Sequence, residues 1–318
     1  MLRKQSFKDY TEFDLWNSYY SVGLDKFYVY NDEFNKVENL NFKKDGIKLL
    51  HSLCTFIYCR SNVNGGAITF IGNSSISEDK FYDEGSINYV QASNRFTTAH
   101  HTYAYLSSSE NYTLNEGCLY NSKFKSTNMG GIYIEKGSKT IKYYNCSNCE
   151  SGCNSCLCMK DSEDAPNISF CNFISNAAVL DTSCFVVYQS PQGNKYSADH
   201  FVMLNNTHKG NGGIIESYYT NLYIDNSVIL GNPGSSYMFY TSNGKIIISN
   251  SIVDYMTSSS ANGAFESSNI SHRTPNGWEF KLLSPSYLRH SKICTKCENK
   301  LFCSSIDYIM ILFCLVLK

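Results

Sequence analysis

Short stretches with an apolar residue at every second position recur along the chain, and each ends at an asparagine. In one of them Ile246 and Ile248 precede Asn250. Spacing of this kind indicates a strand with one buried face. We therefore expect each asparagine to lie on the inner side of its strand end, in one structural ladder. The asparagines of this predicted ladder are Asn94, Asn121, Asn145, Asn172, Asn206, Asn226 and Asn250.

A second column alternates with the first and consists of a small or glycine pair followed by an apolar strand. Examples are Gly65-Gly66-Ala67-Ile68, Gly130-Gly131-Ile132-Tyr133, Gly212-Gly213-Ile214-Ile215 and Asn262-Gly263-Ala264-Phe265. Strands of two kinds at a fixed phase are typical of a solenoid. In a parallel β-helix the coils pair at about 4.8 Å, and stacked amides satisfy polar groups that are costly to bury alone. A β-sandwich with asparagine-rich turns is the alternative.

First-strand positions near residues 67, 103, 132, 156, 184, 214, 237 and 264 predict an all-β solenoid of about eight coils. The chain before these coils departs from the repeat, and a cap there would cover an open strand edge. We expect an N-terminal cap at 1–49, a β-helix at 50–275, a cysteine-containing C-terminal cap at 276–305 and a short apolar tail at 306–318.

Charge and the N-terminus narrow the function classes. The 27 basic and 28 acidic residues give a formal net charge of −1, so the basic footprint of a nucleic-acid-binding protein is missing. We expect no nucleic acid partner. The segment after Met1 runs into charged residues without the apolar stretch of a secretory signal peptide.

The 14 cysteines allow three interpretations. Cys146, Cys149 and Cys153 lie close enough in sequence to contribute to a structural zinc site. Repeat register instead turns Cys156, Cys158 and Cys184 into the core as small apolar groups. Cys146 and Cys171 flank ladder asparagines and are expected to face outward, where a disulfide is the third interpretation. We favour buried thiols and predict no metal and no cofactor.

Catalytic chemistry needs convergent groups that this sequence does not display. A glycosidase requires two carboxylates across the sugar ring, whereas the acidic cluster Asp161, Glu163 and Asp164 is typical of a solvated loop. His100-His101 has no carboxylate companions at strand or helix spacing. We predict no catalytic residue.

The glycine repeats resemble a known family. Gly65-Gly66-Ala67-Ile68 after Cys54–Cys59, Gly130-Gly131-Ile132-Tyr133-Ile134 and Gly212-Gly213-Ile214-Ile215 are similar to the repeats of polymorphic outer membrane proteins. The chain thus resembles the right-handed parallel β-helix, pectin-lyase-like superfamily, and within it surface β-helix proteins of parasitic protists. The resemblance implies a right-handed coil and adhesion or display at a cell surface. A fold alone does not fix a function.

These observations favour a non-enzymatic surface or membrane-associated β-helix that displays a ligand-binding face. We expect its partner to be a carbohydrate or a host or cell-surface protein. Tyrosine runs such as Tyr218-Tyr219, Tyr143-Tyr144 and Tyr103-x-Tyr105 offer stacking platforms for sugars. The alternatives are a polysaccharide lyase or glycoside hydrolase, and a divergent or truncated family member without a retained function.

The apolar tail permits two interpretations. Tyr308–Leu317 is uninterrupted apolar and is followed by Lys318. About 20 residues are needed to cross a bilayer, so the segment is either a short membrane anchor, which we favour, or a final strand or capping helix. We expect membrane association or a cell-surface location.

Overall fold

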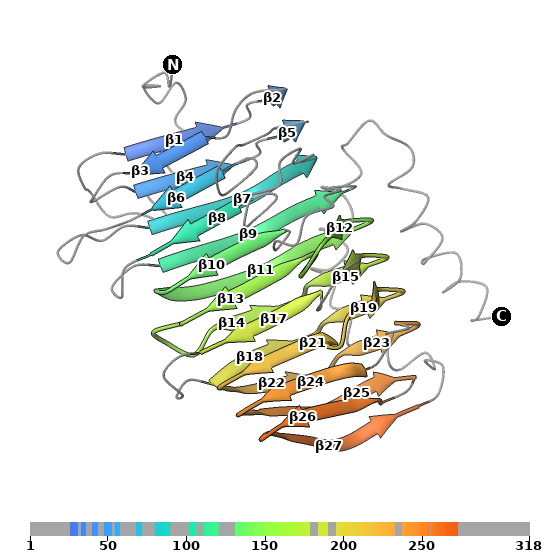
Figure 1. Ribbon diagram of the computed structural model, residues 1–318. Helices are drawn as coiled ribbons and strands as arrows, with labels where there is room; N and C mark the ends of the chain where they lie inside the picture. Colours follow the sequence, from blue (N-terminus) through green and yellow to red (C-terminus); the bar gives the residue numbers. More distant parts are fainter. Residues whose placement is uncertain are drawn as a thin grey trace.

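The computed structural model describes residues 102–106, 111–120, 131–178, 184–189, 195–232, 237–254 and 256–272, together with the backbone of seven earlier strands. Successive strands follow one another down the molecule, from the blue N-terminal strands to the orange C-terminal ones (Figure 1). The described residues form strands and bends, as expected for a chain rich in tyrosine, phenylalanine and asparagine.

The strands are short, and most have two to six residues. They are β1 Lys26–Tyr30, β2 Glu33–Asn35, β3 Leu40–Lys43, β4 Lys48–Ser52, β5 Thr55–Ile57, β6 Ile68–Ile71, β7 Lys80–Tyr89, β8 Thr102–Tyr105, β9 Asn111–Tyr120, β10 Ile132–Glu135, β11 Ser138–Ser147, β12 Glu150–Ser151, β13 Leu157–Lys160, β14 Asn167–Ser169, β15 Asn172–Ile174, β16 Ala177–Ala178, β17 Phe185–Tyr188, β18 Lys195–Asp199, β19 Val202–Leu204, β20 Thr207–His208, β21 Gly213–Tyr218, β22 Asn221–Asp225, β23 Val228–Leu230, β24 Tyr237–Ser242, β25 Lys245–Val253, β26 Ser258–Ala261 and β27 Ala264–Ser271.

The pairings between the described strands are parallel, and they arrange the strands in sheets of 15, 9 and 3 strands. One turn runs from β10 in the nine-stranded sheet, through β11 in the fifteen-stranded sheet, to β12 in the three-stranded sheet. The next turn repeats this order with β13, β14 with β15, and β16. Each residue of one turn therefore has an equivalent in the next, and a side chain type repeated in sequence becomes a column in space.

The turns bend where single residues adopt positive φ. Lys136, Tyr143 and Asn148 mark three bends of one turn, with φ of 61°, 55° and 53°. Left-handed backbone conformation is costly for most residues and is tolerated best by glycine and asparagine. Among the described residues, seven of the fourteen non-glycine residues with positive φ are asparagines, so asparagine is the residue type that most often forms these bends.

The core runs along the inside of the stack. Between the bends, alternate side chains point inward, so one column of the nine-stranded sheet contains Ile132, Leu157, Phe185 and Ile215, each 0% exposed. Phe173 packs against Phe185 at a ring separation of 6.3 Å, joining the two larger sheets. Burial of such side chains supplies about 1.5 to 3 kcal/mol each before the entropy cost of folding.

The structure confirms an all-β parallel solenoid and corrects its size: residues 102–253 form about five turns, not eight. One expected coil start belongs to another part of the turn. Gly263 follows the bend residue Asn262 and lies beside Gly244 of the preceding turn. Ala264 then begins β27 of the fifteen-stranded sheet. A glycine after a bend and a glycine before a first strand give the same sequence pattern.

Candidate functional site

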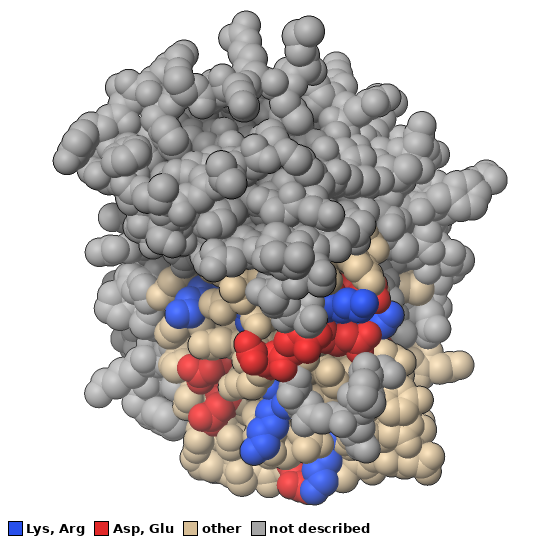
Figure 2. Space-filling model, turned by 90° about the vertical axis from the view of Figure 1, so that its left-hand side faces the viewer, with Lys and Arg blue, Asp and Glu red and all other residues tan. Residues whose placement is uncertain are grey.

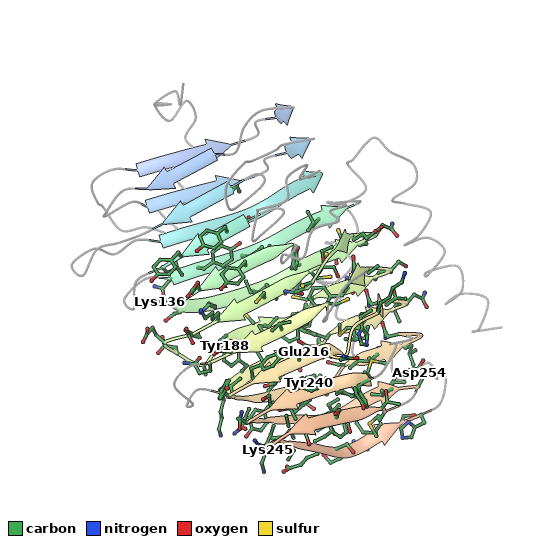
Figure 3. All side chains as sticks on the ribbon, viewed as in Figure 1. Lys136, Tyr188, Glu216, Tyr240, Lys245 and Asp254 are labelled. Atoms are coloured by element: carbon green, nitrogen blue, oxygen red, sulfur yellow. The ribbon has the colours of Figure 1, made fainter. Side chains whose placement is uncertain are left out.

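Tyrosines gather on the outer face of the nine-stranded sheet. The outward positions of β8, β10, β13, β17, β21 and β24 form two columns, because each strand pairs with the next in fixed register. Figure 3 shows the labelled Tyr188, Glu216 and Tyr240 near one another on this sheet. We call this surface the tyrosine face, and its rings are Tyr103, Tyr105, Tyr133, Tyr188, Tyr218 and Tyr240.

The rings contact one another along the solenoid axis. Tyr103 and Tyr133 stack with centroids 5.5 Å apart and planes 5° from parallel. Tyr218 lies between Tyr188 and Tyr240, with centroids 6.1 and 5.7 Å away. Stacking separations of this size contribute about 1 kcal/mol per pair beyond area burial. The face is therefore a preorganised set of rings.

One ion pair lies among these rings. Lys160 Nζ contacts Glu135 Oε1 at 2.9 Å and also lies 5.7 Å from the centre of the Tyr188 ring. Its hydrogen bond to Glu135 raises the pKa of Lys160. The Tyr133 hydroxyl donates to Glu135 Oε2 at 3.1 Å. Both oxygens of the carboxylate thus have partners within the face.

Glu216 is a fully buried carboxylate on the same face. Its Oε1 accepts from the Gly213 amide at 2.9 Å, and its Oε2 accepts from the Tyr218 hydroxyl at 3.1 Å. Burial, and then Glu216, raises the pKa of the nearby Cys158 thiol to about 12. Burial likewise raises the pKa of Tyr133, so both groups remain protonated at neutral pH.

The carboxylates of the tyrosine face are too far apart to act together on one sugar. Glu135 and Glu216 lie on β10 and β21, which are three strand spacings apart. At about 4.8 Å per spacing, the strands are about 14 Å apart. Glycosidase pairs lie about 5 to 9.5 Å apart. Glu135 and Glu216 therefore do not form such a pair.

A second polar group lies on the outer side of another bend. Asp199 and Asp225 are register partners on β18 and β22, and the Asn226 amide donates to both, at 3.0 and 3.1 Å. His200 Nδ1 lies 2.6 Å from Asp199 Oδ2. Asp225 Oδ1 also accepts from Asn250 at 2.8 Å. Stacking of the turns therefore converges carboxylates that are far apart in sequence.

Aromatic rings continue this bend toward the N-terminal turns. Phe170 stacks between Tyr143 and His200, with centroid separations of 5.2 and 4.7 Å. All three residues have positive φ, a conformation that asparagine adopts more readily than a bulky aromatic residue. Retained backbone strain of this kind is a reason to test the group for function.

The predicted asparagine ladder is divided among several columns. Asn206 lies in a fully buried ladder, where its Oδ1 accepts from Asn176 and its Nδ2 donates to Asn232. The three amides repeat at intervals of 30 and 26 residues. Asn176 and Asn232 were not among the predicted members, although their spacing matches the repeat.

The other predicted ladder residues occupy different positions. The Asn172 amide donates a hydrogen bond to Asn145 Oδ1 at 2.5 Å. Both residues belong to an outward-facing column whose next member is Val202. Asn226 and Asn250 stand at a positive-φ bend and are half-buried and exposed, respectively. The remaining predicted members, Asn94 and Asn121, lie outside the described residues.

The cysteines differ from two expectations. Cys146 and Cys171 are buried in the core rather than outward-facing. Cys158 is register partner of Tyr133 and lies beneath the tyrosine face, whereas Cys156 lies in the core as expected. The error is one residue of register, since Leu157, not Cys156, pairs with Ile132.

The buried thiols lie close together. Ser155 Oγ contacts Cys156 and Cys184 at 3.6 and 3.5 Å, and burial raises the pKa of Cys156. Neutral thiols are poor metal ligands. Within the described ranges, no group of three or more His, Cys, Asp or Glu side chains is arranged to hold a metal ion. His100-His101 and the C-terminal cysteines lie outside those ranges.

Charges of both signs cover the edge next to the tyrosine face. Figure 2 shows lysines and acidic side chains side by side on its described part. Ser138 donates to Asp164 at 2.5 Å, and Glu163 and Asp164 are exposed, in keeping with the predicted solvated loop.

Among the residues whose structure is described, no helix has the length and apolarity required to span a membrane.

Sequence reasoning found part of the tyrosine face. Tyr103, Tyr105 and Tyr218 lie on it as outward residues, but Tyr144 is buried in the core. Tyr133 and Tyr188 were missed as binding candidates, and their outward positions follow once the register is known. Asp199 and Asp225 had no local sequence signal, because only stacking brings them together.

Comparisons of the chain with protein-family models, curated proteins and solved structures found no significant match. The fold and the site define a class, a parallel β-solenoid with a tyrosine-rich outer face.

Proposed function

We propose that the protein is a non-enzymatic, surface or membrane-associated β-helix that binds a carbohydrate ligand along its tyrosine face. The observation that carries the proposal is the alignment of six tyrosines from five turns, those of β8, β10, β17, β21 and β24, on one outer sheet face. Rings of this kind stack on the apolar faces of sugars. Adhesion or display is the function that such a face serves.

The proposal extends to the finer fold assignment. Parallel crossover connections are right-handed in nearly all known sheets, which favours a right-handed coil. The pectin-lyase-like assignment and the location at a cell surface rest on the resemblance of the glycine repeats. A protein ligand is the alternative occupant of the face.

Binding to a panel of polysaccharides by calorimetry tests the function. We expect Tyr188→Ala and Tyr218→Ala each to weaken binding about fivefold, because each removes about 1 kcal/mol of stacking. Tyr223→Ala is the matched control, since Tyr223 is a half-buried outward tyrosine on β22 of a different sheet. Circular dichroism and thermal unfolding verify that the variants remain folded.

Two results contradict the proposal. Absence of binding to every carbohydrate tested would remove a sugar as the ligand. An equal loss of affinity in the Tyr223→Ala control would place binding on another face. In either case the tyrosine face would be assigned to stability alone.

Asp199 and Asp225 support a second candidate, a glycoside hydrolase. Their strands are adjacent, so their backbones are about 4.8 Å apart, close to the separation of a retaining carboxylate pair. Against it, Asn226 bridges the two carboxylates and Asp225 also accepts from Ser249 and Asn250. We expect no turnover of polysaccharides. Robust turnover that Asp225→Asn abolishes would establish the hydrolase instead.

A further inference from the structure

An apolar patch lies on the outer face of the strands that follow the Tyr143 bend. Strand alternation turns Phe173, Met203 and Ile229 into the core, so their neighbours point outward. Outward-facing aliphatic side chains form two adjacent columns over β15, β19, β23 and the end of β25. We call them the aliphatic face: Val202, Val228, Ile252, Ile174, Leu204 and Leu230.

The aliphatic face lies outside the two hydrophobic clusters of the described residues, and none of its six residues belongs to either. Ile174, Leu204, Val228 and Leu230 are half-buried and form the accessible part of the face. Val202 and Ile252 lie deeper, with exposures of 9% and 2%. Polar residues border the patch, with the Asn145–Asn172 pair at one end and the exposed Asp254 at the other. An apolar outer patch with a polar rim is typical of a docking site.

The described chain leaves the solenoid beside this face. β27 is paired with β25, and His272 Nδ1 lies 2.8 Å from the Val253 carbonyl, next to Ile252 of the face. From there the sequence continues to the apolar segment Tyr308–Leu317. Residues 273–307 can span about 3.3 Å each when extended, which far exceeds the width of the face.

We propose that the segment Tyr308–Leu317 docks on the aliphatic face of its own chain. The occupant matches the site in chemistry, because all ten of its residues are apolar. It also matches in size: ten residues measure about 15 Å as a helix, and β15 to β25 covers three spacings of about 4.8 Å. Lys318 follows the segment and complements Asp254 at the rim of the face. Ten residues are too few to span a bilayer.

Thiol labelling of the full-length chain, read residue by residue by mass spectrometry, tests the docking through Cys314. In the wild-type chain we expect Cys314 to be protected. Leu204→Lys introduces a charge into the face and is expected to speed labelling of Cys314 about tenfold or more. Ile247→Lys is the matched control, a half-buried outward aliphatic residue on another part of the fifteen-stranded sheet, and it should leave Cys314 protected.

Leu230→Ser serves as a second, milder face variant, and circular dichroism verifies the fold of each variant. Light scattering and vesicle flotation accompany the labelling. Fast labelling of Cys314 in the wild type overturns the proposal, as does protection that neither face variant changes. A dimer that Leu204→Lys dissociates would make a second copy the occupant, and flotation with vesicles that requires Tyr308–Leu317 would make a lipid surface its partner. A monomer with releasable Cys314 supports intramolecular docking.

Discussion

Asn205 and Asn206 are neighbours in sequence and have opposite environments. Asn205 is exposed at a bend with φ of 55°, where its type matters for the backbone conformation. Asn206 is fully buried, and its side chain bonds to two other ladder amides and to the Phe173 carbonyl. The same residue type stabilises the bend from outside in one case and the core from inside in the other.

The bend column and the ladder column therefore contribute through different physics. Along the bend stand Asn148, Ser175, Asn205 and Gly231, which share positive φ but differ in side chain. A bend needs a tolerant backbone, so several residue types satisfy it. The buried ladder depends on its amides, because each amide offers two N–H donors together with an acceptor oxygen at each turn. We therefore expect the exposed bend to accept several residue types and the buried ladder to accept few substitutions.

The largest expected effect is that of Asn206→Ala. The substitution leaves the Asn176 amide donor and the Phe173 carbonyl without their ladder partner, and each buried group left unsatisfied costs about 1 to 3 kcal/mol. We expect a loss of about 3 kcal/mol or more in the free energy of unfolding, measured by urea denaturation.

Asn205→Gly is the matched control, because glycine keeps the positive φ at no steric cost. We expect it to change the free energy of unfolding by less than about 0.5 kcal/mol. Similar effects of the two substitutions would mean that the ladder amides contribute no more than the bend.

The solenoid could be predicted from the sequence because asparagine and glycine recur at regular intervals, which indicates a structural repeat. The sequence did not predict the phase of each column. A positive-φ bend interrupts strand alternation, so Asn172 and Asn226 follow similar apolar pairs, yet Asn172 pairs with Val202 whereas Asn226 lies at a bend. The bend position cannot be derived from alternation alone, since tyrosine, phenylalanine and histidine occupy it in other turns.

The candidate site was predictable to a smaller extent for the same reason. Outward tyrosines follow from alternation inside one strand, as for Tyr103 and Tyr105. Contacts between strands require the register, as for the Glu135–Lys160 pair, which comes from residues 25 positions apart. The ladder register was within reach of the sequence, because Asn176, Asn206 and Asn232 repeat at nearly constant spacing.

The second largest expected effect concerns a buried cation, Lys139. The asparagine ladder, in contrast, buries only neutral amides. Lys139 is 3% exposed, and its Nζ donates to the carbonyls of Gly137 and Lys160. Burial lowers the pKa of Lys139 to about 7. The unfolded chain binds this proton up to about pH 10.4, so the unfolded state holds more protons between pH 7 and 10.

Stability must therefore rise with pH in that window. Relative to Lys139→Met, we expect the wild-type free energy of unfolding to increase by about 1.5 kcal/mol between pH 7 and 8.5. Denaturation at several pH values measures the difference. The measurements stop at pH 8.5 because buried cysteines change stability in the opposite direction at higher pH. Burial raises the pKa of Cys171 to about 12, so above about pH 9 the unfolded chain has lost this proton while the folded chain keeps it, and stability falls as pH rises. A pH-independent difference would show that Lys139 is solvated.

The smallest expected effect belongs to the bend column. Ser175 is exposed with φ of 55°, and its amide donates to the Leu204 carbonyl of the next turn. Ser175→Asn gives the bend the residue found at the equivalent Asn148 and Asn205. Asparagine tolerates this conformation better than serine does, so we expect a gain of about 0.5 kcal/mol in the free energy of unfolding. Thermal denaturation of wild type, Ser175→Asn and Ser175→Gly measures it. A gain in both variants assigns the effect to the backbone, whereas a loss in both would mean that the serine hydroxyl has a role of its own and that the bend is as strict as the ladder.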